Sequence, residues 1–382
     1  MECLWRLMGM VANLPRPARS VGSFQKRFHW DEFSVVGQVF FPIENGRGSR
    51  VKSGPSTYFR QGTALGTAGF ANLPPLILKF LAHVVHPLSD HQDVQPNLEK
   101  GSLPVILFSH GLGGNAEVYT ALCSHLASEG FVVVAIEHAD GSGAYAVTHS
   151  EEEVFYTRPP STMEYTRENV VEFRSRFFKH RMKELECVLG SLASVKTDDP
   201  TEENVLNSID MSNKILCGHS FGGATAVYAA HFFPKDYFKC IVLHDLWPFP
   251  VPVDICDVGV RAPPTVSILS EVFAKGDEVH ITEELAANSG ENFLNFYITG
   301  TVHTSFSDCP FWLPVFAGKR LNLTGERDRD QVLSLLTDLT SNFIKDVIGC
   351  DDYAENLYFK CCTYGDAIRL MPSSKSKLKP KN

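Results

Sequence analysis

The feature that most constrains the fold is a series of short, almost purely apolar segments separated by longer segments of helical character. These apolar segments are 104–109, 130–136, 214–217, 241–243, 265–269 and 293–298. A strand with one face in water would show a polar residue at every second position, and these segments do not. Strands that are apolar on both faces are typical of a parallel sheet covered by helices on both sides. We therefore predict an α/β protein with a mostly parallel central sheet flanked by helices.

The intervening segments predict the covering helices. Apolar residues recur at helical spacing over 167–192, which indicates one long amphipathic helix. Shorter helices are expected at 118–129, 224–233 and 331–347.

The ends of the chain differ in character from its middle. A strand is expected at 34–42, followed by a long loop over 44–72, where Gly, Ser and Thr are frequent. No internal repeat is present. The prediction is a single domain over 31–370, preceded by a flexible segment at 1–30 and followed by a basic, disordered tail at 371–382.

Net charge and cysteine spacing argue against several function classes. The formal net charge of −9 at pH 7 opposes nucleic-acid binding, because phosphate recognition needs a basic surface. The ten cysteines include no C-x-x-C pair, so a zinc or redox site has no support in the sequence. No metal and no cofactor is expected.

The segment Gly218-His219-Ser220-Phe221-Gly222 matches the pattern G-x-S-x-G between an apolar strand and a helix rich in small residues. In that context the serine occupies a sharp strand-to-helix turn, which presents its hydroxyl at the edge of the sheet. This predicts an α/β-hydrolase fold with Ser220 as a nucleophile. The N–H of Phe221, at the start of the helix, is expected to stabilise the oxyanion of an acyl-transfer intermediate.

A second oxyanion donor is expected from a loop after an earlier strand. His110-Gly111-Leu112-Gly113-Gly114 follows such a strand and is similar to the HGGG-type motif of esterases. We assign the second donor to the N–H of Leu112.

In this fold the nucleophile is followed along the chain by the acid and then by the base. Asp245 directly follows the apolar strand after the nucleophile helix, whereas Asp254 and Asp257 lie further on and are weaker candidates. His303 follows the last predicted strand, and the other histidine downstream of Asp245, His280, lies in a charged segment. Asp245 is therefore predicted to orient the imidazole of His303, which acts as general base.

With these residues identified, the chain resembles the platelet-activating-factor acetylhydrolase family, which comprises lipoprotein-associated and cytosolic type II phospholipases that work without calcium. The resemblance extends from about residue 35 to about residue 345. The matching stretches are Phe108 to Gly113, Glu137-His138 with Asp140 and Ser142, Gly218 to Thr225, Asp245 to Pro250, and Val302-His303 with Phe306.

The resemblance implies that Ser220, Asp245, His303 and Leu112 have the roles given above. It also implies a phospholipid substrate, with hydrolysis of a short or oxidised acyl chain at the sn-2 position, including release of acetate from platelet-activating factor. One departure is Ala139, where the family often has an arginine.

The apolar stretch 73–88 is bounded by prolines and is too short to span a bilayer. Packing against the core is the first expectation, and contact with a lipid surface is the alternative. A secretory signal has a positively charged start followed by an uninterrupted apolar stretch. Here Glu2 precedes the apolar residues and Arg6 interrupts them, so the first residues match such a signal poorly. A cytoplasmic location is expected, and the sequence leaves membrane association and secretion open.

Two other functions remain open at this point. One is a general carboxylesterase of the same fold, chlorophyllase-like or dienelactone-hydrolase-like. The other is a non-catalytic α/β-hydrolase that serves as a binding module.

Overall fold

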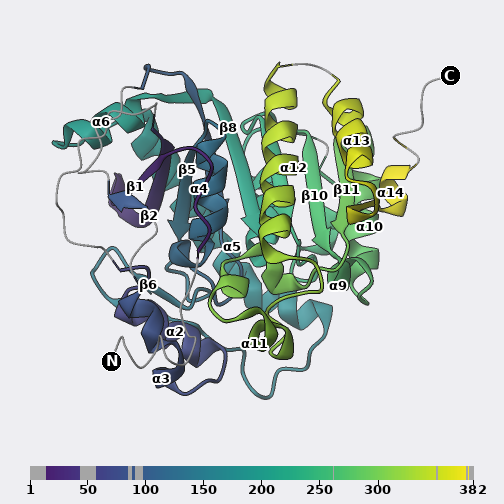
Figure 1. Ribbon diagram of the computed structural model, residues 1–382, viewed down its shortest axis with the longest axis horizontal. Coiled ribbons are helices and arrows are strands. Elements are labelled where there is room, and N and C mark those ends of the chain that lie inside the picture. Colours follow the sequence, from purple (N-terminus) through teal and green to yellow (C-terminus); the bar gives the residue numbers. More distant parts are fainter. Residues whose placement is uncertain are drawn as a thin grey trace.

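The computed structural model describes residues 14–43, 57–84, 88–90, 98–260, 262–349, 352–375 and 377. Its centre is a sheet with the strand order β12-β11-β10-β9-β8-β4-β5-β2-β1-β3 (Figure 1). The strands of this sheet are β1 Val21–Trp30, β2 Phe33–Pro42, β3 Ser89–Asp90, β4 Leu103–Ser109, β5 Val132–Glu137, β8 Ile209–His219, β9 Cys240–His244, β10 Thr265–Ser270, β11 Phe293–Ile298 and β12 Ile368–Leu370. A separate small sheet pairs β6 Tyr145–Val147 with β7 Glu153–Phe155.

The six central strands, from β5 through β4, β8, β9 and β10 to β11, are all parallel to one another. Antiparallel strands flank them, β2 beside β5 and β12 beside β11. The predicted mostly parallel sheet is therefore confirmed, and its antiparallel members lie outside the predicted apolar segments.

Helices cover both faces of the sheet (Figure 1). The α-helices are α2 Gln61–Phe70, α3 Pro75–Leu78, α4 Thr120–Ser128, α5 Arg167–Ala193, α6 Pro200–Asn207, α7 Phe221–Phe232, α8 Val253–Val258, α9 Glu271–Ala274, α10 Val279–Asn288, α11 Val315–Arg320, α12 Arg329–Gly349, α13 Tyr353–Thr363 and α14 Pro372–Lys375. Short 3-10 helices are η1 Lys79–His83, η3 Ala116–Tyr119, η4 Gly290–Asn292, η5 His303–Phe306, η6 Cys309–Phe311 and η7 Gly365–Ala367.

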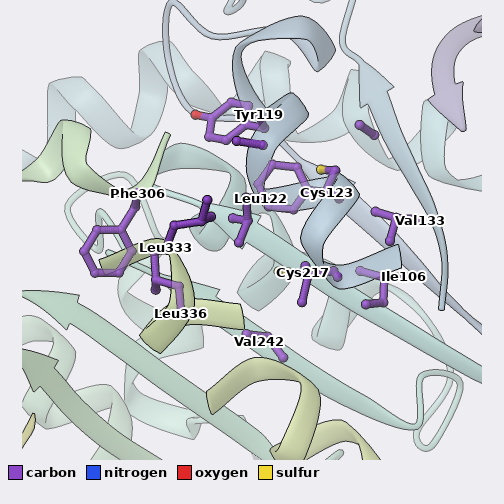
Figure 2. Packing of buried hydrophobic residues seen from close by; sticks show 14 of the residues in the cluster. Ile106, Tyr119, Leu122, Cys123, Val133, Cys217, Val242, Phe306, Leu333 and Leu336 are labelled. Atoms are coloured by element: carbon purple, nitrogen blue, oxygen red, sulfur yellow. The ribbon is translucent and has the colours of Figure 1, made fainter. Parts of the chain in front are cut away.

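The core forms one layer on each face of the sheet because successive side chains of a strand point in opposite directions. In β4, Ile106 and Phe108 face the layer that α4 and α12 cover, whereas Val105 and Leu107 face the layer under α5 and α7. Figure 2 shows part of the first layer, where strand and helix side chains meet. Burial on both faces explains why these strands are apolar throughout.

The predicted flexible segment 1–30 is wrong for its last ten residues, which form β1. β1 pairs with β2 from Val21 opposite Pro42 to Trp30 opposite Phe33, and it buries Phe24 and Phe28. The intervening Gln, Lys and Arg hide the strand in the sequence. Residues 1–13 of the predicted segment lie outside the described residues.

The predicted loop 44–72 is also wrong where the structure describes it, because residues 61–70 form α2. The small residues that suggested a loop permit close packing instead. A Cβ on Gly66 would lie 2.0 Å from the Ala144 carbonyl oxygen, so a larger side chain has no room there. Residues 44–56 lie outside the described residues.

The predicted disordered tail, 371–382, begins with an ordered turn. Residues 372–375 form α14, and the buried Ser374 hydroxyl accepts a hydrogen bond from the N–H of Asn295 on β11 at 2.6 Å. The tail prediction is therefore wrong up to this point, and residues 376 and 378–382 lie outside the described residues.

Candidate active site

Ser220 lies between β8 and α7 in a strained backbone conformation, with φ 57° and ψ −117°. Its N–H donates to the carbonyl of His244 on the neighbouring strand at 2.9 Å, and its carbonyl accepts from the N–H of Trp247 at 3.2 Å. These bonds hold a conformation that a serine otherwise avoids. The side chain is thereby fixed at the carboxyl edge of the sheet.

The two glycines of the motif are required by close backbone contacts. A Cβ on Gly218 would lie 2.2 Å from the Gly222 carbonyl oxygen, and a Cβ on Gly222 would lie 1.9 Å from the Ser109 carbonyl oxygen. Both distances are far shorter than a van der Waals contact, and in each case the obstructing atom is a backbone carbonyl oxygen. The sharp turn at Ser220 is therefore possible only with glycine at these positions.

Asp245 and His303 form a direct hydrogen bond, with 2.7 Å between Asp245 Oδ2 and His303 Nδ1. The other carboxylate oxygen of Asp245, Oδ1, accepts from the N–H of Ser270 at 2.6 Å. Asp245 is completely buried directly after β9, as its position after the strand predicted. Since both oxygens act as acceptors, the carboxylate holds the imidazole in the tautomer with its proton on Nδ1.

The imidazole of His303 lies between two other rings. Phe273 stacks on it with ring centroids 4.3 Å apart, and His219 stacks on it with centroids 4.6 Å apart. The His303 side chain is 33% exposed, and it lines the same cavity as Ser220. Two stacked rings and one carboxylate thus fix the plane of the candidate base.

His219, the residue before Ser220, connects three loops of the site. The N–H of Gly111 donates to the Tyr119 hydroxyl at 3.2 Å, and that hydroxyl donates to His219 Nδ1 at 2.9 Å. His219 Nε2 then donates to the carbonyl oxygen of His303 at 3.2 Å. Burial, followed by the neighbouring histidines, lowers the pKa of His219 well below its usual value. The ring is therefore neutral, which this pattern of one donor and one acceptor requires.

Residues 110–114, which we name the oxyanion loop, lie against Ser220. A Cβ on Gly111 would be 2.9 Å from the Ser220 Cβ, so the loop approaches Ser220 as closely as a glycine allows. The N–H groups of Gly113 and Gly114 donate within the fold, to Ser142 and Gly111. In the described part of the chain, the N–H groups of Leu112 and Phe221 have no acceptor. Two free amides thus flank the serine.

A cavity of about 580 Å³ lies above Ser220 and His303. Much of its wall is apolar, with Phe70, Leu73 and Ile77 from the segment of α2 and α3, and Leu313, Leu321 and Leu323 from the chain around α11. In the described residues, no Asp, Glu, Lys or Arg side chain lines it. The cavity suits an apolar ligand with an ester placed at the serine.

The weaker candidates from the sequence lie elsewhere. Asp254 and Asp257 are exposed on α8, and His280 is exposed with its Nδ1 donating to the Asp277 carbonyl. None of the three lines the cavity. Sequence reasoning missed the contacts of Tyr119 with His219 and of Phe273 with His303, since in each pair the two residues are far apart in the sequence.

The ligand atoms of His219, Asp245 and His303 lie within 4.8 Å of one another, a spacing that could suit a metal ion. However, both ring nitrogens of His219 and the Nδ1 of His303 already take part in hydrogen bonds. The donor set fits a hydrogen-bonded catalytic group better than a coordination sphere.

Comparison with known proteins identifies the family to which most of the chain matches. The family described as "Platelet-activating factor acetylhydrolase, isoform II" matches residues 34–357. The platelet-activating factor acetylhydrolase of Cavia porcellus is 31% identical over 260 residues, which are 65% of this chain and 58% of that protein. The chain therefore spans less than two thirds of the length of this relative.

Two further relatives match this chain over a larger share of their own length. A putative phospholipase A2 of Schizosaccharomyces pombe is 27% identical over 64% of this chain and 68% of its own. The platelet-activating factor acetylhydrolase of Bos taurus is 28% identical over 86% of this chain and 76% of its own.

A solved structure of similar fold is a ferulic acid esterase from Streptomyces cinnamoneus. It matches 95% of this chain and 99% of its own with a TM-score of 0.67 and 16% sequence identity. At this identity the likeness concerns the fold alone, and it confirms the predicted α/β-hydrolase fold. The family match over residues 34–357 shows more: this chain belongs to the platelet-activating factor acetylhydrolase isoform II family.

Proposed function

We propose that the protein is a serine esterase that hydrolyses the sn-2 acetyl ester, or a short or oxidised acyl ester, of glycerophospholipids such as platelet-activating factor. The observation that carries the proposal is the hydrogen-bonded pair Asp245–His303 beside Ser220 in one apolar cavity. The relatives reported above, two of which are named platelet-activating factor acetylhydrolases, support the substrate class.

In the proposed reaction His303 Nε2 removes the proton of the Ser220 hydroxyl while Oγ attacks the ester carbonyl. Asp245 stabilises the imidazolium that forms, because its carboxylate accepts the Nδ1 proton at 2.7 Å. The tetrahedral oxyanion accepts hydrogen bonds from the N–H groups of Leu112 and Phe221, which have no acceptor in the described chain. The intermediate then collapses: the bond between the acyl carbon and the sn-2 oxygen breaks, and His303 gives its proton to that oxygen, which releases the lyso-lipid. Water, deprotonated by His303, attacks the acyl-enzyme, and its collapse returns the proton to Ser220 Oγ and releases the acid.

The test is hydrolysis, in the presence of EDTA, of a phosphatidylcholine with an sn-2 acetyl chain and of one with an sn-2 palmitoyl chain. We expect release of acetate at a rate that EDTA does not change, because the proposed mechanism uses no metal ion. Little palmitate should be released, because the proposed substrates carry a short or oxidised sn-2 chain. Cleavage of p-nitrophenyl acetate with neither lipid cleaved would instead favour a general carboxylesterase. Cleavage of no ester at all would favour the non-catalytic binding module.

We also propose that the cavity mouth contacts lipid surfaces. We define this mouth by five exposed apolar side chains: Leu73, Leu76 and Ile77 in or beside α3, and Phe316 and Leu321 in or beside α11. Three of them, Leu73, Ile77 and Leu321, also line the cavity. Apolar side chains around the entrance would bring a lipid substrate directly to the serine.

The apolar stretch 73–88, for which lipid contact was the alternative expectation, contributes only its first part to this mouth. Phe80, Leu81 and Ala82 of η1 are buried in the core, so the packing expected first for this segment holds for them. Residues 85–87 lie outside the described residues. In the described part of the chain, no helix has both the length and the hydropathy of a membrane span.

A double substitution tests this contact. Leu76→Ser with Phe316→Ser removes the two most exposed apolar side chains at the mouth, which are 69% and 78% exposed. We expect binding to phosphatidylcholine vesicles, measured by sedimentation, to weaken roughly tenfold or more, because about 0.8 kcal/mol is lost per CH₂ no longer buried. Hydrolysis of soluble p-nitrophenyl acetate should stay at the wild-type rate.

Phe359→Ser is the matched control for the vesicle experiment. Phe359 is 59% exposed on α13 and does not line the cavity. Equal loss of binding in this variant would contradict contact through the mouth.

We further infer a cytoplasmic location with peripheral membrane contact. The eight cysteines in the described residues are all free, and six of them are buried. Free thiols in this number are typical of a reducing compartment.

A further inference from the structure

Arg181 is a charged residue inside the core that the proposed reaction does not use. It projects from α5 beneath the oxyanion loop, and it is completely buried. A buried guanidinium is costly unless its donors are satisfied. Its Nε donates to Asp140 Oδ2 at 3.0 Å, its Nη1 faces Ser109 Oγ, the His110 carbonyl oxygen and Thr225 Oγ1, each at 3.0 Å, and its Nη2 donates to Ser142 Oγ at 2.7 Å.

These acceptors belong to three segments that surround the nucleophile. Ser109 and His110 end β4 and begin the oxyanion loop, and Thr225 lies in α7. Asp140 and Ser142 lie in the turn after β5. Because the guanidinium is planar with five fixed N–H groups, it sets the relative positions of all three segments.

We propose that Arg181 is a positioning residue that holds both oxyanion donors, the N–H groups of Leu112 and Phe221, in place through the hydrogen bonds of its buried guanidinium. The proposal rests on the function proposed above, since it concerns the same acyl-transfer reaction. It assigns to α5 a role in catalysis that none of the sequence motifs indicates.

The first donor, Leu112, lies between two points that Arg181 fixes. On one side Arg181 binds the His110 carbonyl oxygen at 3.0 Å. On the other side the N–H of Gly113 donates to the Ser142 carbonyl at 2.9 Å, and the hydroxyl of that serine accepts from Arg181. The peptide of Leu112 is thus held on both sides by groups bound to one guanidinium.

The second donor, Phe221, is held through its side chain and its carbonyl. The Arg181 guanidinium lies over the Phe221 ring, 4.6 Å from the centroid. Thr225 Oγ1 accepts from Arg181 and donates to the Phe221 carbonyl oxygen at 2.8 Å. Movement of the guanidinium would therefore displace the first turn of α7, which carries the Phe221 N–H.

Two acceptors of Arg181, Asp140 and Ser109, are held in place by further charges and hydrogen bonds. Burial alone would raise the pKa of Asp140, but the charge of Arg181 and hydrogen bonds from Ser142 outweigh it and lower that pKa. Asp140 is therefore ionised and balances the guanidinium. The Ser109 hydroxyl donates to His138 Nε2 at 2.8 Å, which leaves a lone pair of Ser109 Oγ free to accept from Arg181.

This second serine–histidine pair continues to an acid, because His138 Nδ1 lies 2.5 Å from Glu184 Oε2. The arrangement is similar to a catalytic triad, but Ser109, His138 and Glu184 are all completely buried. Ser109 Oγ also faces a guanidinium rather than a cavity. The chain of three residues therefore supports the position of Arg181 and does not act as a second nucleophilic site.

The test compares Arg181→Gln and Arg181→Lys with wild type on a soluble acetyl ester. The concentration of active serine is first titrated with a fluorophosphonate, so that rates refer to folded sites only. Loss of one oxyanion donor typically lowers kcat by about 10²- to 10³-fold. We expect kcat of Arg181→Gln to fall by about that factor with KM within about threefold, and Arg181→Lys, which keeps the charge facing Asp140, to fall less.

A trifluoromethyl ketone supplies a readout that a loss of stability would not change. It forms a tetrahedral adduct with the serine, so its inhibition constant should rise by the same factor by which kcat/KM falls. Arg174→Gln is the matched control. Arg174 is also a buried arginine of α5 near the Phe221 ring, at 5.9 Å, but it donates to Tyr156 and makes no hydrogen bond to the oxyanion loop.

The outcomes separate this inference from the proposed function. Unchanged kcat per titrated site in both Arg181 variants, or an equal loss in Arg174→Gln, would overturn the positioning role alone. Failure of the wild type to hydrolyse any ester would overturn the proposed function and this inference with it. If Arg181→Gln yields no folded protein, the Arg181→Lys result decides by the same criteria.

Discussion

Ser220→Ala is expected to lower kcat for both the acetyl lipid and p-nitrophenyl acetate by about 10⁵- to 10⁶-fold, the scale seen when a triad nucleophile is removed. Alanine keeps the Cβ that the sharp turn between β8 and α7 already accommodates, and removes only the hydroxyl. The backbone bonds of residue 220 to His244 and Trp247 do not involve that hydroxyl, so the fold should be retained. Steady-state kinetics and a thermal melt measure the two effects separately.

Ser267→Ala is a suitable control for the nucleophile experiment. Ser267 is completely buried on β10, and its hydroxyl has no hydrogen-bond partner in the described part of the protein. This variant should retain the wild-type rate. Residual activity above about 1% in Ser220→Ala, with contamination excluded by a repeat purification, would show that another group attacks the ester.

Asp245→Asn is expected to lower kcat by about 10⁴-fold, the effect known for this change in a Ser-His-Asp triad. Both carboxylate oxygens accept hydrogen bonds, from Ser270 N–H and from His303 Nδ1–H. An asparagine that keeps the bond to Ser270 presents its NH₂ to His303. The imidazole must then accept at Nδ1 and carry its proton on Nε2, the tautomer that cannot deprotonate Ser220.

Asp254→Asn tests the competing assignment of the acid directly. Asp254 is exposed on α8 and outside the cavity, so its substitution should leave kcat unchanged. A loss of less than about a hundredfold in Asp245→Asn, or a comparable loss in Asp254→Asn, would be incompatible with Asp245 as the orienting acid. Nuclear magnetic resonance of the His303 ring protons would report the tautomer independently.

The central strands were predictable because burial on both faces leaves a continuous apolar run, as in β4 and β5. The common location of Ser220, Asp245 and His303 was predictable because Ser220 and Asp245 directly follow β8 and β9, and His303 comes shortly after β11. β1 and α2 were not, for opposite reasons. β1 is half exposed and carries Gln25, Lys26 and Arg27 in succession, so it lacks an apolar run. α2 is rich in small residues, which are typical of loops but here allow close packing.

The supports of the site were beyond sequence reasoning because they depend on contacts between distant segments. Arg181 lies in a long helix with several other arginines, and its sequence position does not show that it alone faces the oxyanion loop. Tyr119 meets His219 although 100 residues separate them in the chain. Such contacts follow from how strands are ordered in the sheet, and spacing along the sequence does not encode that order directly.

The bond from His219 to the carbonyl of His303 has a mechanical consequence. Downstream of His303 the chain continues through η5 and η6 to α11, which carries the exposed Phe316 at the cavity mouth. This bond anchors the backbone of His303 to the end of β8, directly before Ser220. Movement of α11, for example on the lipid surface proposed above, would therefore have to pass through residues 304–314 before it could shift the His303 backbone relative to Ser220.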